Sequence, residues 1–439
     1  MVEGMFFRRF GKNIGKAFVW LDRKLGVGIR SLYMPHVKVA DNQIMFLPYQ
    51  HEVACNPKYI SDELIRRKAP VEIYWSVSLS QYAHVDLEDV LAKTTRDGKV
   101  DKKSKEYREL KAWCGEHVHF VRPNSYEYFR AAASSKILVT NSILGDKFYN
   151  FPVKKEQHVV ETWHGSLGIK RFDLAHYHTN MSWPVAAIRT GRQTTECISN
   201  STFEEAVYKE TFWPDKPSLR LGHARNDVFF PQYQGGRAFL RNAFIREHDL
   251  KGGDDLHFAL YGPTFRDDHD FTVFDLNGEE TVHAFEERFG GRWKLLVRFH
   301  DNDRKTGSAS RNTIHGKDVI DVTDYPDMQE LLAFTDAAIT DYSSWIYDFV
   351  LTRKPGFLFA MDADKYNDER GFYFRLEDTP FPVAHDSDEL SEAIRSFDSQ
   401  TYPAKVEKFL ADKGCMDDGS ASERIADQFL AWMDSKTTC

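Results

Sequence analysis

The densest group of potentially reactive side chains follows a short apolar run at residues 158–162. His164 is flanked by Gly165 and Ser166, and Lys170 follows shortly after. A histidine titrates near neutral pH, and glycine lets the backbone approach a ligand closely, so this group suits proton transfer beside an anionic substrate. A histidine that is merely hydrogen-bonded within a glycine turn is the alternative that these residues leave open.

A second group follows the apolar run at residues 337–340. Asp341 ends that run, Ser343 and Ser344 follow, and a helical pattern then begins. A turn from strand to helix directs backbone N–H groups, hydroxyls and the positive end of the helix dipole toward one point, which favours phosphate. A serine that only caps the helix is the structural alternative.

Cationic side chains follow two further apolar runs. Alternation along a strand at residues 295–300 predicts that Arg298 and His300 project together, and such a pair is costly to bury without an anion. Arg266 comes two residues after Thr264, and its guanidinium suits a forked contact to phosphate oxygens. We therefore expect cations beside the phosphate-favouring turn.

Two loops contribute weaker candidates. Arg225 and Asp227 lie in a loop-rich stretch at residues 213–236, and Arg370 lies in an aromatic and basic loop near Phe372. Arginines in loops are more often solvated than bound to a ligand. The chain carries no Walker-A loop, so it is not a P-loop protein.

The elements that must position these groups alternate between short apolar strands and helical patterns. This alternation predicts parallel sheets covered by helices, in which ligands lie at the carboxyl ends of the strands. The predicted strands, about ten and enough for two sheets, are 44–47, 71–75, 117–121, 137–140, 158–162, 256–261, 295–300, 319–322, 337–340 and 356–359. The predicted parts are residues 1–35, 36–215, 216–415 and a C-terminal helical part at 416–439, in which residues 421–433 show an amphipathic helical pattern.

Composition restricts the class of protein. The 439 residues are 42% hydrophobic and carry 58 Lys and Arg against 66 Asp and Glu, a net charge of −8. A large folded core is therefore expected, and nucleic acid is not expected as a partner. The five cysteines lack metal-knuckle spacing, so we expect reduced thiols, no disulfide framework and no metal site.

Residues 1–30 differ from the rest of the chain. Seven Lys or Arg against two acidic residues give them a charge of +5. A helical stripe of aromatic residues within this basic segment predicts contact with an anionic membrane surface. An amphipathic helix packed on the protein body is the alternative. The predicted membrane contacts are Phe7, Arg8, Arg9, Phe10, Lys12 and Phe18. The charged start lacks the apolar run of a signal peptide, which favours a chain kept in the cytosol.

Together, the motifs resemble the CDP-glycerol glycerophosphotransferase family, which includes teichoic-acid primases and polymerases and related capsule polymerases. The resemblance runs from about residue 159 to about residue 374. The matching motifs are Trp163-His164-Gly165, Pro263-Thr264-Phe265-Arg266, Arg298-x-His300, Ile339 to Ser344, and Arg370-Gly371-Phe372. The segment from Ser166 to Lys170 is one residue longer than the commoner pattern and resembles a capsule-like branch.

The resemblance implies an α/β protein of the GT-B type, with two Rossmann-like domains facing a central cleft. It also implies a peripheral enzyme at the cytoplasmic face of the cell membrane. The implied donor is CDP-glycerol or CDP-ribitol, and the implied acceptor is a polyprenyl-diphosphate-linked glycan. The CDP-polyol is then a substrate, no cofactor is expected, and the oligomeric state stays open.

In this reading, His164 is the general base, and His300 and Arg266 contact the donor phosphates. Ser343 and Ser344 hold the diphosphate, Arg298 is also predicted to bind the donor phosphates, and Lys170 is a candidate for the acceptor phosphate. Asp341 is expected mainly to brace the turn or a histidine. Contact with the donor phosphates is its less favoured role. Gly165, Ser166, Thr264, Arg225, Asp227 and Arg370 are predicted as further donor or acceptor contacts. A GT-B glycosyltransferase and a non-catalytic membrane-bound nucleotide-binding protein are the rival functions.

Overall fold

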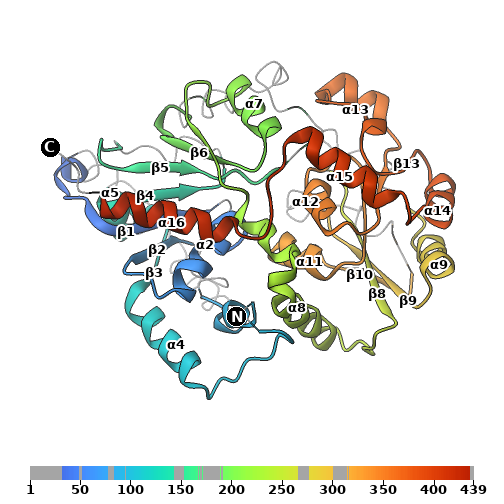
Figure 1. Ribbon diagram of the computed structural model, residues 1–439, viewed down its shortest axis with the longest axis horizontal. Coiled ribbons are helices and arrows are strands. Elements are labelled where there is room, and N and C mark those ends of the chain that lie inside the picture. The colour runs from blue at the N-terminus through green and yellow to red at the C-terminus, as the bar shows by residue number, and fades with distance from the viewer. Residues whose placement is uncertain are drawn as a thin grey trace, which may run out of the picture.

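The computed structural model describes residues 32–48, 52–77, 84–93, 95–142, 153–166, 168, 171, 188, 191–264, 276–299, 314 and 316–435, without the side chains of 369 and 370. These residues form two lobes, each built on a parallel sheet (Figure 1). The predicted membrane contacts Phe7, Arg8, Arg9, Phe10, Lys12 and Phe18 lie outside the described residues.

The first lobe contains a seven-stranded sheet in the order β3-β2-β1-β4-β5-β6-β7. All of its pairings are parallel, and the strand order reverses between β1 and β4. Because both faces are covered, the central strands are nearly continuous apolar runs. The strands are β1 Ala40–Leu47, β2 Glu72–Ser76, β3 Val118–Val121, β4 Ser135–Thr140, β5 His158–Glu161, β6 Glu196–Ser199 and β7 Ser218–Arg220.

The second lobe repeats this arrangement with six strands in the order β10-β9-β8-β11-β12-β13. Its strands are β8 Leu256–Tyr261, β9 Arg292–Val297, β10 Val319–Asp321, β11 Ala337–Thr340, β12 Gly356–Phe359 and β13 Val383–Ala384. The prediction that Arg298 and His300 alternate on one strand is wrong for Arg298, because β9 ends at Val297. Leu295, Leu296 and Val297 are all buried, as expected where a sheet is covered on both faces.

Side-chain caps define where several helices begin. Asp86, Ser104, Ser125, Ser201, Asn277, Asp327 and Asp386 each accept a backbone N–H of the first turn. The α-helices are α2 Cys55–Arg66, α3 Leu87–Ala92, α4 Lys105–His117, α5 Tyr126–Ser134, α7 Thr202–Glu210, α8 Gln234–Glu247, α9 Gly278–Phe289, α11 Met328–Phe334, α12 Trp345–Phe349, α13 Ala363–Arg370, α14 Ser387–Arg395, α15 Tyr402–Lys413 and α16 Ala421–Asp434. The 3-10 helices are η1 Met34–His36, η4 Ala224–Phe229, η5 Pro231–Tyr233, η8 Val350–Thr352 and η9 Leu376–Asp378.

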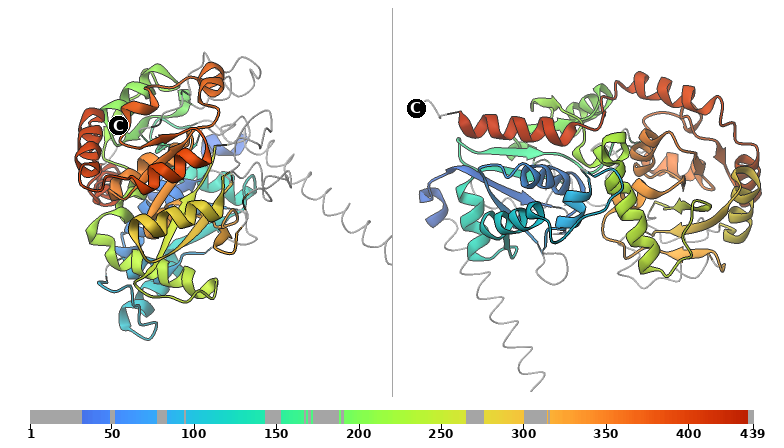
Figure 2. Two further views of the ribbon diagram at one scale, coloured as in Figure 1. Left: turned by 90° about the vertical axis from the view of Figure 1, so that its right-hand side faces the viewer. Right: turned by 60° about the horizontal axis from the view of Figure 1, so that its bottom comes forward.

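The chain crosses between the lobes twice. It leaves the first lobe through η4 and η5 into α8, and it returns after α15 to form α16, which packs against α2 and β1 (Figures 1 and 2). The predicted C-terminal helix at residues 421–433 is thus confirmed as α16.

The first sheet extends past the predicted boundary at residue 215, because β7 at Ser218–Arg220 pairs with β6. None of the three β7 residues is buried, so no apolar run marks this edge strand in the sequence. The division into four parts otherwise stays a prediction. Among the described helices, none combines the length and apolar character needed to cross a membrane.

Candidate functional site

The turn that carries His164 begins where β5 ends. Trp163 adopts a positive φ of 52°, which is uncommon for a bulky residue and is sustained by local contacts. Its backbone N–H donates to Glu161 Oε1 at 2.8 Å. Burial raises the pKa of the Glu161 carboxyl to about 8, so this group is mostly protonated at neutral pH. The turn therefore rests on a buried acid that keeps a hydrogen-bond acceptor in place.

The His164 ring is exposed and oriented by a backbone carbonyl. Nδ1 lies 2.6 Å from the Asn141 carbonyl oxygen, just past the end of β4. Because a carbonyl only accepts hydrogen bonds, Nδ1 must carry the hydrogen. In the neutral ring, Nε2 then holds the lone pair and is the atom that can take a proton. This geometry suits the predicted general base.

The loop after His164 lies against the second lobe. A Cβ added at Gly165 would lie 3.6 Å from Ser344 Oγ, and one at Gly168 would lie 3.5 Å from Ser344 Cβ. Ser166 Oγ accepts a hydrogen bond from Asn200 Nδ2 at 2.9 Å. The structure therefore brings the loop that follows His164 close to Ser344 across the two lobes.

The turn after β11 is braced by Asp341. Its buried carboxylate accepts the backbone N–H of Thr264 at 2.9 Å and that of Tyr342. These contacts favour the bracing role over a phosphate contact, since the carboxylate carries the same sign of charge as phosphate. Ser343 and Ser344 are half-buried, and Ser344 precedes α12 without a side-chain capping hydrogen bond. A simple serine N-cap therefore does not account for Ser344.

Arg298 and Thr264 lie at the neighbouring strand ends. The Arg298 backbone N–H donates to the Tyr261 carbonyl at 2.9 Å, and its guanidinium lies 3.6 Å from Met328 Sδ at the start of α11. Thr264 is buried and contacts Asp341 through its backbone. Thr264 therefore borders the turn, whereas Arg298 follows β9, the next strand beyond β8. Their predicted contacts with the donor stay predictions.

Arg225 and Asp227 are buried in η4. The Asp227 carboxylate accepts the backbone N–H groups of Ala421 at 2.9 Å and Ser422 at 2.7 Å, and so holds the start of α16. Burial raises the pKa of the Asp227 carboxyl to about 7. Arg225 Nη1 donates to the His164 carbonyl at 2.6 Å. Arg225 thus supports the His164 turn and Asp227 supports the start of α16, and their predicted contacts with donor or acceptor stay predictions.

The remaining predicted residues are placed only in part. His300, Arg266 and Lys170 lie outside the described residues, as does the side chain of Arg370. The backbone next to Arg370 is informative, because the Gly371 carbonyl accepts the Arg171 N–H at 2.9 Å. The Arg-Gly-Phe segment therefore contacts the chain that follows the His164 turn.

A family model for CDP-glycerol:poly(glycerophosphate) glycerophosphotransferases matches residues 30–431. The chain belongs to this glycerophosphotransferase family. The match confirms the resemblance seen in the motifs and extends it over both lobes.

Relatives and solved structures agree with this membership. The chain is 30% identical over 323 residues to a teichoic acid poly(glycerol phosphate) polymerase of Staphylococcus epidermidis, covering 70% of this chain and 43% of that protein. It is 25% identical over 329 residues to a teichoic acid glycerol-phosphate transferase of Staphylococcus aureus, covering 70% of this chain and 79% of that protein. Further relatives are named for ribitol phosphate. The chain thus spans less than half of the S. epidermidis polymerase.

The solved structure of the wall teichoic acid polymerase TagF is 25% identical, with a TM-score of 0.73. The likeness covers 99% of this chain and 98% of that one. It confirms the predicted GT-B-like fold of two Rossmann-like lobes.

Several residues that support the His164 turn were missed from sequence. Asn56, Asn141, Glu161 and Asp348 all contact the His164 turn or its supports. No local motif marks Asn56 or Asn141, which reach the turn only through the fold. Asp348 lies within the segment that follows Asp341, and its spacing from Ser344 along the helix was the one usable signal.

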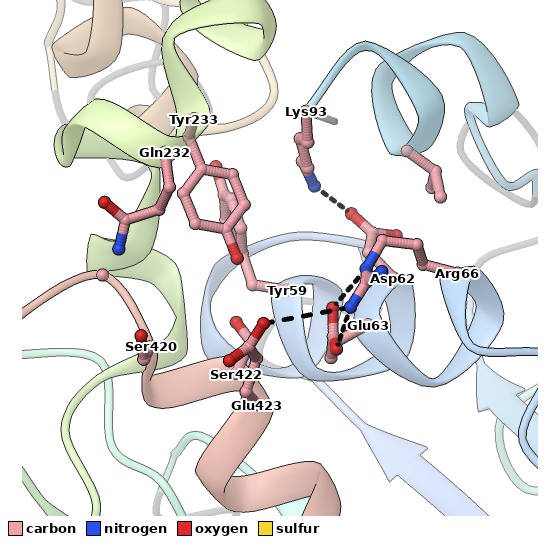
Figure 3. A pocket seen from close by; sticks show the side chains of 12 residues that line it. Tyr59, Asp62, Glu63, Arg66, Lys93, Gln232, Tyr233, Ser420, Ser422 and Glu423 are labelled. Carbon is pink, nitrogen blue, oxygen red and sulfur yellow. Dashed lines mark hydrogen bonds and ion pairs between the residues drawn. The ribbon is translucent and has the colours of Figure 1, made fainter. Parts of the chain in front are cut away.

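A cavity of about 320 Å³ lies elsewhere, between α2, η5 and the start of α16 (Figure 3). Its charged groups pair with one another: Lys93 Nζ lies 2.6 Å from Asp62 Oδ2, and Arg66 Nη2 lies 2.6 Å from Glu63 Oε1. None of the predicted site residues lines it. Across the described ranges, no group of three or more His, Cys, Asp or Glu is arranged to hold a metal ion. The expectation that no cofactor is needed stays a prediction.

Proposed function

We propose that this chain transfers a polyol phosphate, glycerol phosphate foremost, from a CDP-polyol to a hydroxyl of a lipid-linked acceptor. The observation that supports the proposal is the close approach of Gly165 and Gly168, in the loop that carries His164, to Ser344 of the second lobe. In the proposal, His164 and the hydroxyl-bearing turn before α12 act on the same substrate from the two lobes. Membership of a glycerophosphotransferase family supports the type of reaction.

The reaction is a phosphoryl transfer. The acceptor oxygen attacks the phosphorus that bears the polyol, and its proton passes to His164 Nε2. The bond from that phosphorus to the bridging oxygen breaks, CMP leaves with the bonding electrons, and a phosphodiester forms. Such a transition state depends on in-line positioning and on charge stabilisation more than on covalent help.

Each remaining group has a defined role in this proposal. Ser343 and Ser344 hold the donor diphosphate, with Arg266 and His300 as its cationic partners. Lys170 contacts the acceptor phosphate. Arg298 supports the donor side from the end of β9.

The choice of substrates rests on the relatives. The S. epidermidis and S. aureus relatives are named for glycerol phosphate, which favours CDP-glycerol over CDP-ribitol. A polyprenyl-diphosphate-linked glycan at the inner membrane surface is the proposed acceptor. Residues 1–30, with a charge of +5, would hold the enzyme peripherally at the cytoplasmic face.

A panel of donors tests the proposal. The protein is incubated with CDP-glycerol, CDP-ribitol or a UDP-sugar and a lipid-linked acceptor, and the mass of the acceptor is measured. We expect growth by glycerol phosphate units with CDP-glycerol. Growth by a sugar would establish the rival glycosyltransferase, and no growth with any donor would support the non-catalytic rival.

A further inference from the structure

The backbone of His164 is held on both sides of its Cα atom. Asn56 Nδ2 donates to the Trp163 carbonyl at 3.2 Å and to the Thr162 carbonyl at 2.9 Å. Arg225 Nη1 donates to the His164 carbonyl at 2.6 Å. The peptide units before and after His164 are therefore both restrained, which sets the direction of its Cα–Cβ bond.

The Arg225 guanidinium is itself placed by a residue of the second lobe. Arg225 is 4% exposed, and its Nη2 lies 2.8 Å from Oδ2 of Asp348, which is 1% exposed. Its Nη1 also lies 3.3 Å from Cys55 Sγ, and its backbone N–H donates to Asn56 Oδ1 at 3.1 Å. A buried guanidinium needs an anion, and Asp348 supplies it.

Asp348 lies on α12, one helical turn after Ser344. The Ser344 turn is therefore connected to the His164 backbone through three links. These are α12, the ion pair of Asp348 with Arg225, and the hydrogen bond from Arg225 to the His164 carbonyl. A buried ion pair is weak as a source of stability, but removal of one partner leaves the other charge buried and unpaired, so the pair keeps the Arg225 guanidinium beside Asp348.

We propose that Asp348 is a positioning residue, which acts through Arg225 to keep the His164 base at a fixed distance from the Ser343–Ser344 turn. The proposal rests on the proposed function, in which His164 takes the proton and the two serines hold the donor diphosphate. It gives Arg225 a role in alignment instead of a direct contact with substrate.

The kinetic test uses Asp348→Asn, Arg225→Lys and the double variant. A displacement of the base by about 1 Å would reduce kcat by about 10- to 100-fold, whereas KM for CDP-glycerol should change little. Residues that act as one unit are not additive, so the double variant should be no slower than the slower single variant. Additive losses, or a wild-type kcat in a folded Asp348→Asn protein, would overturn the proposal.

Asp62→Asn is the matched control. It removes a buried carboxylate that pairs with Lys93 and Lys58 and has no hydrogen bond or ion pair to the described residues of the His164 turn. Its melting temperature should fall while kcat stays at the wild-type value. An equal loss of kcat in this control would show that Asp348 acts through general stability and would also overturn the proposal. If Asp348→Asn does not fold, Arg225→Lys carries the same comparison.

A measurement independent of turnover separates this proposal from the proposed function. Nuclear magnetic resonance of isotope-labelled histidine, with His164→Ala for assignment, reports the tautomer of the His164 ring. We expect the Nδ1–H tautomer in the wild type and in Asp62→Asn, and a mixture of tautomers in Arg225→Lys and Asp348→Asn. An unchanged tautomer in both would reject the positioning role. A wild type that turns over no CDP-polyol would instead reject the proposed function.

Discussion

At the scale of single residues, the exposed His164 ring combines two features that a base needs. Its Nδ1 is committed to the Asn141 carbonyl, and its backbone is held by buried polar groups. The type of residue and its glycine neighbours were enough to predict a base here. The orienting groups were not predictable, because Asn56, Asn141 and Arg225 are far from His164 in the sequence and reach it only in the folded protein.

Replacement of His164 by glutamine tests the base directly. Glutamine is close in size and keeps a hydrogen-bonding end, but it cannot take a proton. We expect kcat to fall by about 100- to 10,000-fold, with binding of CDP-glycerol nearly unchanged. Rapid-quench kinetics and isothermal titration measure the two quantities. Nearly full turnover would show that another group accepts the proton.

Glu161→Gln tests the buried acid beneath the turn. Burial raises the pKa of Glu161 to about 8 in the folded protein, against about 4.3 for an unfolded glutamate. Its stabilising contribution is therefore full below about pH 4.3 and is lost as the pH rises through about 8. Because of this group, the free energy of unfolding of the wild type should fall by about 2–3 kcal/mol between about pH 5 and about pH 7.

Glutamine resembles the protonated acid and does not titrate, so the stability of Glu161→Gln should depend less on pH. Melting temperatures of both proteins across this pH window measure the difference. Asp227 also has a raised pKa, but it contributes equally to both proteins and cancels from the comparison. If the melting temperatures of the two proteins changed with pH in parallel, Glu161 would not titrate between about pH 5 and about pH 7.

At the scale of elements, the sequence allowed most central strands to be predicted, because strands buried on both faces are apolar runs. The short edge strands β7 and β13 were missed, as was the four-residue β6 next to β7. β7 buries none of its three residues, and β13 has only two residues. Such strands form because they pair with a neighbouring strand, and the local sequence pattern does not indicate which segment that neighbour is.

Two glycines in helices show that packing decides whether the helix propensity of alanine can stabilise the protein. A Cβ at Gly115 in α4 would meet nothing within 4 Å, whereas one at Gly235 in α8 would lie 1.8 Å from the Thr95 carbonyl oxygen. Gly115→Ala should stabilise the protein by about 0.5–1 kcal/mol, since alanine favours the helix. Gly235→Ala should destabilise it by about 1–3 kcal/mol, since α8 must move away. Thermal unfolding measures the melting temperature of each variant against the wild type. Shifts of the same sign in both variants would contradict this explanation.

At the scale of the whole molecule, the two lobes contribute different groups to the candidate site. The first lobe presents His164, the second presents Ser343 and Ser344, and α16 returns from the second lobe to pack on the first. The two-lobed fold could be predicted from strand count and family resemblance. The contact between the lobes required the structure.

The proposed membrane attachment depends on residues 1–30, which lie outside the described residues. Removal of these residues should abolish sedimentation with anionic vesicles and leave the melting temperature unchanged. Binding of the full chain should weaken with salt, because the Debye length falls from about 10 Å at 0.1 M to about 3 Å at 1 M. Unchanged sedimentation together with a lower melting temperature would show that the segment packs on the body.

In the proposed reaction, an acceptor hydroxyl attacks the phosphorus that bears the polyol. Heavy oxygen placed in that hydroxyl can be followed by mass spectrometry during one turnover with CDP-glycerol. We expect the label to be kept in the new phosphodiester, the released nucleotide to be unlabelled CMP, and His164→Gln to form neither product at an appreciable rate. Release of CDP, or loss of the label from the acceptor, would contradict the proposed reaction.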